Sequence, residues 1–175
     1  MSPEQSGVAA ALARLRGEIA ADRRGMARRA LDLDEAERRL GEHAGDAAAL
    51  ALAAWAIHGW YTALESILER VARQIDAEVP SGDRWHRALL AQATVEVPGV
   101  RPAILPPELR ADLEELLAAR HFLRHAYGAE LDARRLAENA ARIHAIGPVV
   151  ERSLGELEGF LAKAIGEATG SGESR

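Results

Sequence analysis

The sequence predicts an all-α protein, an antiparallel helical bundle that begins with a long helical hairpin. Hydrophobic residues make up 48% of the 175 residues, but they are dominated by Ala and Leu, and aromatic residues contribute only 4%. This composition favours helices over strands. Apolar residues also recur at heptad spacing through two long segments, as in helices that pack side by side. We expect one domain over residues 1–168 and a disordered Gly/Ser-rich tail over residues 169–175.

The first 40 residues predict one long amphipathic helix. Its apolar residues recur every seven positions, at Leu12, Ile19, Met26, Leu33 and Leu40. Asp22 and Arg29 interrupt the companion row. The arginine pairs of this segment alternate with acidic residues, which is typical of a solvated, self-neutralised face rather than of an RNA site.

A second helix follows a break at residues 41–45, and Asp46 is placed to cap it. Its apolar positions again step by seven, and the face extends towards Pro80. Two long helices joined by a short loop predict an antiparallel hairpin. Trp60 and Tyr61 are expected in the core or at a dimer contact; the alternative is that they stack on a base.

The rest of the chain predicts three further helices. Ser81, Gly82 and Asp83 form a turn with a capping residue before a short helix that ends near Thr94. Residues 95–107 carry four prolines, so they predict a long loop, placed to border a substrate cleft. A helix then runs from Pro107 to Gly128, and a last one begins after Asp132 and is kinked or divided at Gly147–Pro148.

Composition and charge exclude several classes of protein. The chain has no Cys, which rules out disulfides and Cys-ligated zinc and is typical of a cytoplasmic protein. No segment resembles a signal peptide, and the longest apolar run, residues 47–57, is too short to span a bilayer, so we expect no membrane partner. The net charge of −5 argues against a broad basic face for duplex nucleic acid. Any RNA would be held by a local cluster: Arg120 and Arg124, with Arg134 or Arg135.

The end of the fourth helix concentrates arginines and histidines. Arg120 falls within its apolar stripe, where a charge must be paired or used. Arg offers a fixed fork of donors to phosphate, and His can move protons near neutral pH. His121 and His125 have the spacing of a metal-binding pair, but two ligands are too few and the neighbouring arginines repel cations. We therefore expect chemistry without a metal or cofactor.

Arg120, His125 and Tyr127 together read R-x4-H-x-Y. This motif resembles that of the HEPN superfamily, in its HepT-like ribonuclease toxin branch, and the resemblance extends over residues 46–142. It implies a homodimer with a composite active site that cleaves single-stranded RNA without metal. Arg120 and His125 would be catalytic, and His121 and Arg124 would support them. Tyr127 would accept AMP from a nucleotidyltransferase antitoxin, unless it is an ordinary core aromatic.

Two alternatives stay open at this point. In a regular helix Arg120 and His125 point about 140° apart, so either the helix is distorted, the Arg120 side chain curls round, or the two residues serve across a dimer. The second alternative is a non-catalytic interaction or nucleotide-binding module, in which Arg120 is locked in an ion pair with Glu65 or Glu69. A paired, occluded Arg120 would favour the module; Arg120 and His125 opening together on a dimer cleft would favour the nuclease.

Overall fold

The structure, a computed structural model, describes residues 2–125 and 131–170 and consists of helices joined by loops. The helices are α1 (Pro3–Glu42), α2 (Ala47–Gln74), α3 (Trp85–Ala93), α4 (Arg110–His125) and α5 (Ala133–Gly170), with a short 3-10 turn, Pro107–Leu109, before α4. The described residues contain no strand, and one isolated bridge joins Val97 and Arg101. The predicted all-α class is confirmed.

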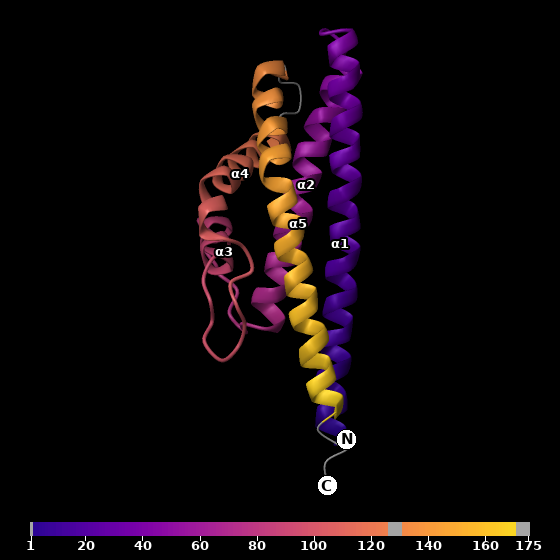
Figure 1. The fold of residues 1–175 in the computed structure, drawn as a ribbon. Helices are drawn as coiled ribbons and strands as arrows, with labels where there is room; N and C mark the ends of the chain where they lie inside the picture. Colours follow the sequence, from indigo (N-terminus) through magenta and orange to yellow (C-terminus); the bar gives the residue numbers. More distant parts are fainter. Residues whose placement is uncertain (1, 126–130, 171–175) are drawn as a thin grey trace.

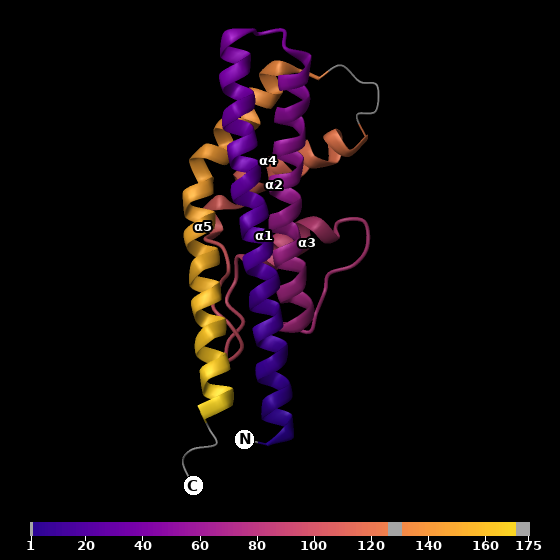
Figure 2. The ribbon, with the colours of Figure 1, turned by 90° about the vertical axis from the view of Figure 1, so that its right-hand side faces the viewer.

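Three long helices form the body of the molecule. In Figures 1 and 2, α1 runs antiparallel to both α2 and α5, and α1 begins at the end of the bundle where α5 finishes. The shorter α3 and α4 lie together on one side of this body, and both pack against α2. The predicted N-terminal hairpin is therefore present, and α2 is the helix that connects it to the motif helix α4.

Polar contacts fix the α1–α2 hairpin. Asp46 caps α2 as predicted, because its Oδ1 accepts the backbone N–H groups of Ala48 and Ala49 at 3.0 Å. The two residues that interrupt the heptad pattern of α1 also face α2. Asp22 accepts a hydrogen bond from Arg70 Nε at 3.1 Å, and the guanidinium of Arg29 lies 5.5 Å from the ring centroid of Trp55.

The core runs along α2. Trp60 and Tyr61 are buried, with exposed fractions of 4% and 3%, so they are core residues and are not placed to stack on a base. By length and composition α2 is apolar enough to cross a membrane, and it is the one described helix of this kind. Its apolar residues pack against the other helices instead, which is the arrangement of a bundle's central helix.

Two local predictions were wrong, one at the end of α2 and one at the start of α3. The helix stops at Gln74 rather than near Pro80. Asp76, two residues beyond the end of the helix, forms a buried ion pair with Arg101. Arg101 Nη2 lies 2.6 Å from Asp76 Oδ2. Downstream, α3 begins after Arg84 and no side chain caps it, so Asp83 is not a cap.

The same ion pair anchors the proline-rich loop of residues 95–107. Arg101 Nη1 donates to the carbonyls of Val95 and Pro102 at 3.0 Å, which folds the loop around one guanidinium. The loop is thus a structural element that ties α3 to the end of α2.

The last helix begins as predicted and continues further than predicted. Asp132 Oδ1 accepts the N–H groups of Arg134 and Arg135 at 2.9 and 3.2 Å. Pro148 lies inside α5, which bends in Figure 2 but is not divided. The helix includes Thr169 and Gly170, which the sequence assigned to the tail; residues 171–175 lie outside the described part of the chain.

Candidate functional site

Arg120 lies on the face of α4 that packs against α2, and it is paired there. Its Nη2 lies 2.6 Å from Glu65 Oε2, and its Nε donates to Thr62 Oγ1 at 3.4 Å. Arg120 and Glu65 are only 8% and 6% exposed. Arg120 Nη1 is also buried, and it has no hydrogen-bond partner among the described residues. The guanidinium is therefore held through Nη2 and Nε, while its third nitrogen is buried without a described partner.

Glu65 holds a second group besides Arg120. Its Oε1 accepts a hydrogen bond from Nδ1 of His86, the second residue of α3. Because a carboxylate accepts here, Nδ1 carries the proton and Nε2 is the nitrogen that can exchange a proton with a ligand. The His86 ring also stacks on Trp85, with centroids 3.7 Å apart, which fixes its orientation. Glu65 thus joins an arginine and a histidine from two other helices.

Two further histidines border this group. The ring of His121 meets that of His86 edge to face, with centroids 4.8 Å apart. His58 lies on α2, one heptad before Glu65. Its pKa is lowered from 6.5, first by burial and then by the positive charges of Arg120 and Arg124; the nearby Glu65 opposes this shift. We call Glu65, Arg120, His58, His86 and His121 the α2–α4 cluster.

A hollow of about 350 Å³ opens beside the cluster, between the start of α3 and the middle of α4. We call it the α3–α4 hollow; it is lined among others by Asp83, Arg84, His86, Arg87, Glu114 and His121. Two members of the α2–α4 cluster, His86 and His121, therefore reach a space that a ligand can enter. No residue of the 95–107 loop lines this hollow, contrary to the expectation that the loop borders a cleft.

The sequence-predicted site residues divide into two groups. Arg120, His121 and Arg124 belong to the described part of α4, where Arg120 is buried, His121 half-buried and Arg124 exposed. His125 is the last residue of α4, and its side chain lies outside the described residues, as does Tyr127. The predicted angle between Arg120 and His125 therefore stays a prediction. Arg134 and Arg135, the other expected RNA contacts, are exposed and lie beside Glu138 and Asp132.

Sequence reasoning found Glu65 as a partner of Arg120 but missed His58 and His86. The signal for His58 was its spacing, seven residues before the acid on the apolar face of α2. His86 gives no such signal, because nothing local connects it to residues 21 positions earlier and 35 positions later. Only the packing of α3 against α2 and α4 brings it to Glu65.

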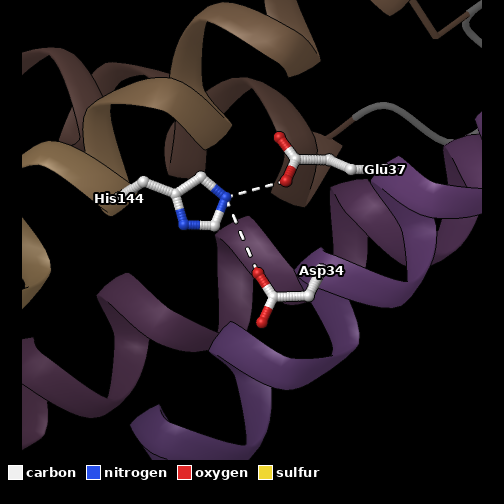
Figure 3. Close-up of side chains that lie close together, drawn as sticks. All are labelled: Asp34, Glu37 and His144. Atoms are coloured by element: carbon white, nitrogen blue, oxygen red, sulfur yellow. Dashed lines mark hydrogen bonds and ion pairs between the residues drawn. The ribbon is translucent and has the colours of Figure 1, made fainter. Parts of the chain in front are cut away.

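One other cluster could hold a metal ion. Figure 3 shows Asp34 and Glu37 of α1 turned towards His144 of α5, with Nε2 of His144 2.8 Å from Glu37 Oε2 and 3.8 Å from Asp34 Oδ1. All three side chains are exposed, and it is the one group of three such ligands among the described residues. It belongs to the α1–α5 contact, whereas the α2–α4 cluster lies on α2, α3 and α4.

The chain was compared with known families, curated proteins and solved structures. A family model described as "HepT-like protein" matches residues 51–161. The matched segment contains every residue of the α2–α4 cluster and the α3–α4 hollow. No curated protein and no solved structure matches the chain.

Proposed function

Since the chain belongs to the HepT-like protein family, whose model matches more than half of its length, we propose that it is an endoribonuclease that cleaves single-stranded RNA without a metal ion. One observation supports this most directly. Arg120 is held by Glu65, the carboxylate that also binds His86, and it keeps a nitrogen without a hydrogen-bond partner among the described residues. A guanidinium in that setting can bind a phosphate oxygen more strongly than it could in water.

The reaction we propose is attack by a ribose 2′-hydroxyl on the adjacent phosphorus. His125 takes the 2′-hydroxyl proton as general base, and O2′ forms the new bond to phosphorus. Arg120 binds the non-bridging oxygens and stabilises their charge in the transition state. The bond to the 5′-oxygen breaks, and that oxygen takes a proton from the partner's His125. The products are a 2′,3′-cyclic phosphate and a 5′-hydroxyl, and no metal or cofactor takes part.

His121 and Arg124 support this chemistry in our proposal. His121 contacts the ring of His86 and lines the α3–α4 hollow, so it can orient the strand. Arg124 is exposed and adds positive charge near Arg120, as its effect on the pKa of His58 indicates.

The proposal is tested with a fluorescent single-stranded RNA in EDTA. Wild type should cleave it, and a His125→Ala protein purified in the same way should not, which excludes a contaminating nuclease. A 5′-hydroxyl on the downstream fragment is expected. Cleavage by the His125→Ala preparation at the wild-type rate, or none by either, would refute the proposal.

We also propose that the protein acts as a homodimer in which Arg120 and His125 of different subunits share a site. This would resolve the angle of about 140° between the two residues within one helix. Mixing the inactive Arg120→Ala and His125→Ala proteins should then restore a small part of the activity, because a mixed dimer has one site with Arg120 and a His125 base and lacks only the second His125 as general acid. Mixtures that stay inactive, although subunits exchange, would place both residues of a site in one chain.

A second candidate function is favoured by a specific observation. Arg120 and Glu65 form the buried ion pair expected of a non-catalytic interaction or nucleotide-binding module. Under that alternative the pair would serve only stability. The two candidates differ in the cleavage rate expected when both partners are replaced by apolar residues.

We propose that the nuclease activity is inhibited by a nucleotidyltransferase antitoxin, which attaches AMP to Tyr127. A bulky anion near Arg120 and Arg124 would compete with RNA for the phosphate site. Mass spectrometry of the co-expressed pair should find AMP on Tyr127, and Tyr127→Phe should cleave RNA but escape inhibition. Suppressed toxicity without an adduct would show another means of control.

A further inference from the structure

In the segment that contains the motif, most arginines form ion pairs, and three have no ion-pair partner among the described residues. Between residues 84 and 142, Arg101, Arg110, Arg120, Arg134, Arg135 and Arg142 each lie within ion-pair distance of a carboxylate. The three that form no ion pair with described residues are Arg84 and Arg87 at the start of α3 and Arg124 near the end of α4. All three are exposed.

Arg84 and Arg87 line the α3–α4 hollow together with His86 and His121. Two carboxylates also line it, Asp83 and Glu114. Glu114 already accepts from Arg110 Nε at 2.9 Å, so only Asp83 opposes the two unpaired guanidinium groups. Because Arg110 neutralises Glu114, one positive charge is in excess at the hollow, although the chain carries a net charge of −5. Such an excess selects an anionic ligand.

The histidines tie this positive region to Arg120. His86 lines the hollow and is held through Nδ1 by Glu65, whose other oxygen binds Arg120. A chain of direct contacts therefore leads from His86, at the hollow, through Glu65 to the buried guanidinium of α4. A strand that passes from the exposed arginines of α3 to Arg120 would follow the α3–α4 hollow.

We propose that the α3–α4 hollow binds the sugar–phosphate backbone of the RNA next to the cleaved bond, with Arg84 and Arg87 as its phosphate contacts. His86 meets the same stretch of strand through Nε2, in an orientation fixed by Glu65 and Trp85. This inference rests on the proposed ribonuclease function and extends it to α3, outside the R-x4-H-x-Y motif. Arginine suits this task because its planar fork of donors matches phosphate oxygens.

The test measures binding rather than cleavage. A fluorescent single-stranded RNA with 2′-O-methyl groups cannot be cleaved through its 2′-oxygen, and its affinity is measured by anisotropy over a range of NaCl concentrations. The double variant Arg84→Gln/Arg87→Gln should bind at least tenfold more weakly at low salt. Because each phosphate contact on a single strand contributes about 0.7 to the slope of log K against log salt, the slope should fall by about 1.4.

The matched control is Arg24→Gln/Arg28→Gln, which removes the same charge from two exposed arginines of α1 that, like Arg84 and Arg87, form no ion pair with described residues. It should change the affinity less than threefold. Equal weakening by the two double variants would reduce the effect to net charge and overturn the inference, as would a wild type that does not bind the oligonucleotide. Both double variants replace exposed residues, so circular dichroism should show unchanged helix content.

The failure of this inference can be told apart from failure of the proposed function. If wild type cleaves natural RNA and the Arg84/Arg87 variant binds like wild type, the strand takes another path and only the inference is wrong. If the specific loss of binding is found but wild type cleaves nothing in EDTA, the hollow is an RNA site on a protein that is not this nuclease.

Discussion

Arg120 Nη2 on α4 and Glu65 Oε2 on α2 lie 2.6 Å apart in the interior of the helical bundle, and both residues are more than nine-tenths buried. The contact crosses from the motif helix to the central helix of the core, and Glu65 extends it to His86 on α3. One carboxylate thus joins three helices and fixes the orientation of Arg120 and of His86, which lines the α3–α4 hollow.

The first prediction separates the structural role of this pair from a catalytic one. Arg120→Met should lower the free energy of unfolding by about 3–5 kcal/mol, because it leaves Glu65 buried with one partner fewer. The double variant Arg120→Met/Glu65→Leu should recover most of that loss, since an apolar pair of similar volume avoids the desolvation of both charges. Urea unfolding followed by circular dichroism measures each value.

Cleavage then decides between the two candidate functions. If Arg120 stabilises the transition state, the stable double variant should cleave at least 100-fold more slowly than wild type, as expected for loss of a charge-stabilising group. A double variant that is stable and still cleaves at the wild-type rate would restrict Arg120 to a structural role. Wild type without activity, together with a recovered double variant, would favour the interaction module.

The second prediction concerns the pKa of His58, which burial and the charges of Arg120 and Arg124 lower from 6.5. An NMR titration of its ring protons should give a midpoint below 6.5. Arg124→Gln should raise that midpoint, because it removes one positive charge and leaves the buried pair in place. Arg152→Gln, an exposed site on α5, should leave it unchanged. A midpoint at or above 6.5 in wild type would contradict the proximity of these charges.

The same shift fixes how His58 affects stability. A lowered folded-state pKa means that the unfolded chain binds the proton more tightly. The stability that neutral His58 contributes to the free energy of unfolding is therefore fully present above about pH 6.5. It is lost as the pH falls from there towards the folded-state pKa. His58→Gln should flatten the pH dependence of the unfolding free energy in this window, and an unchanged dependence would oppose the assignment.

The third prediction is that Arg101 anchors the proline-rich loop. Its side chain is 1% exposed and that of Asp76 is 4% exposed, so Arg101→Met should cost about 3–5 kcal/mol, as for other buried pairs that lose one partner. The matched control is Arg110→Gln, because the Arg110 side chain is 50% exposed in its pair with Glu114. That change should cost less than about 1 kcal/mol. Similar losses in both variants would show that the loop is not anchored by this contact.

Arg101 also illustrates which parts of the structure the sequence could predict. Local signals were sufficient for the α1–α2 hairpin, since Asp46 caps α2 through its own backbone neighbours. The end of α2 was misplaced because its apolar pattern continues to Val79, whereas Asp76 leaves the helix to meet an arginine 25 residues later. Pro148 likewise signals a break, but Ile146 and Val150 are buried on either side of it, and their packing maintains α5.

The candidate site likewise has one part that the sequence could predict and one part that it could not. The abundance of Arg and His at the end of α4, and the acid on the apolar face of α2, were visible in the chain and led to Arg120 and Glu65. The contribution of α3 was not visible, because His86, Arg84 and Arg87 carry no pattern of their own. They acquire a role only when α3 packs against α4 and places them around one hollow.

The last prediction concerns metal. Asp34, Glu37 and His144 could hold a divalent ion, because their ligand atoms all lie within 4.8 Å of one another. In a tetrahedral site with bonds near 2.1 Å, ligand atoms are about 3.4 Å apart, and the two distances from His144 Nε2, 2.8 and 3.8 Å, fall on either side of that value. The group joins α1 to α5, however, and none of its members belongs to the α2–α4 cluster. EDTA should therefore leave RNA cleavage unchanged in both wild type and His144→Gln.

Two other outcomes would contradict this prediction. If cleavage instead needs an added divalent metal and His144→Gln abolishes it, this group would be part of the active site. If it needs metal and His144→Gln cleaves normally, the ion would act elsewhere, and the metal-independent mechanism built on Arg120 and His125 would be wrong.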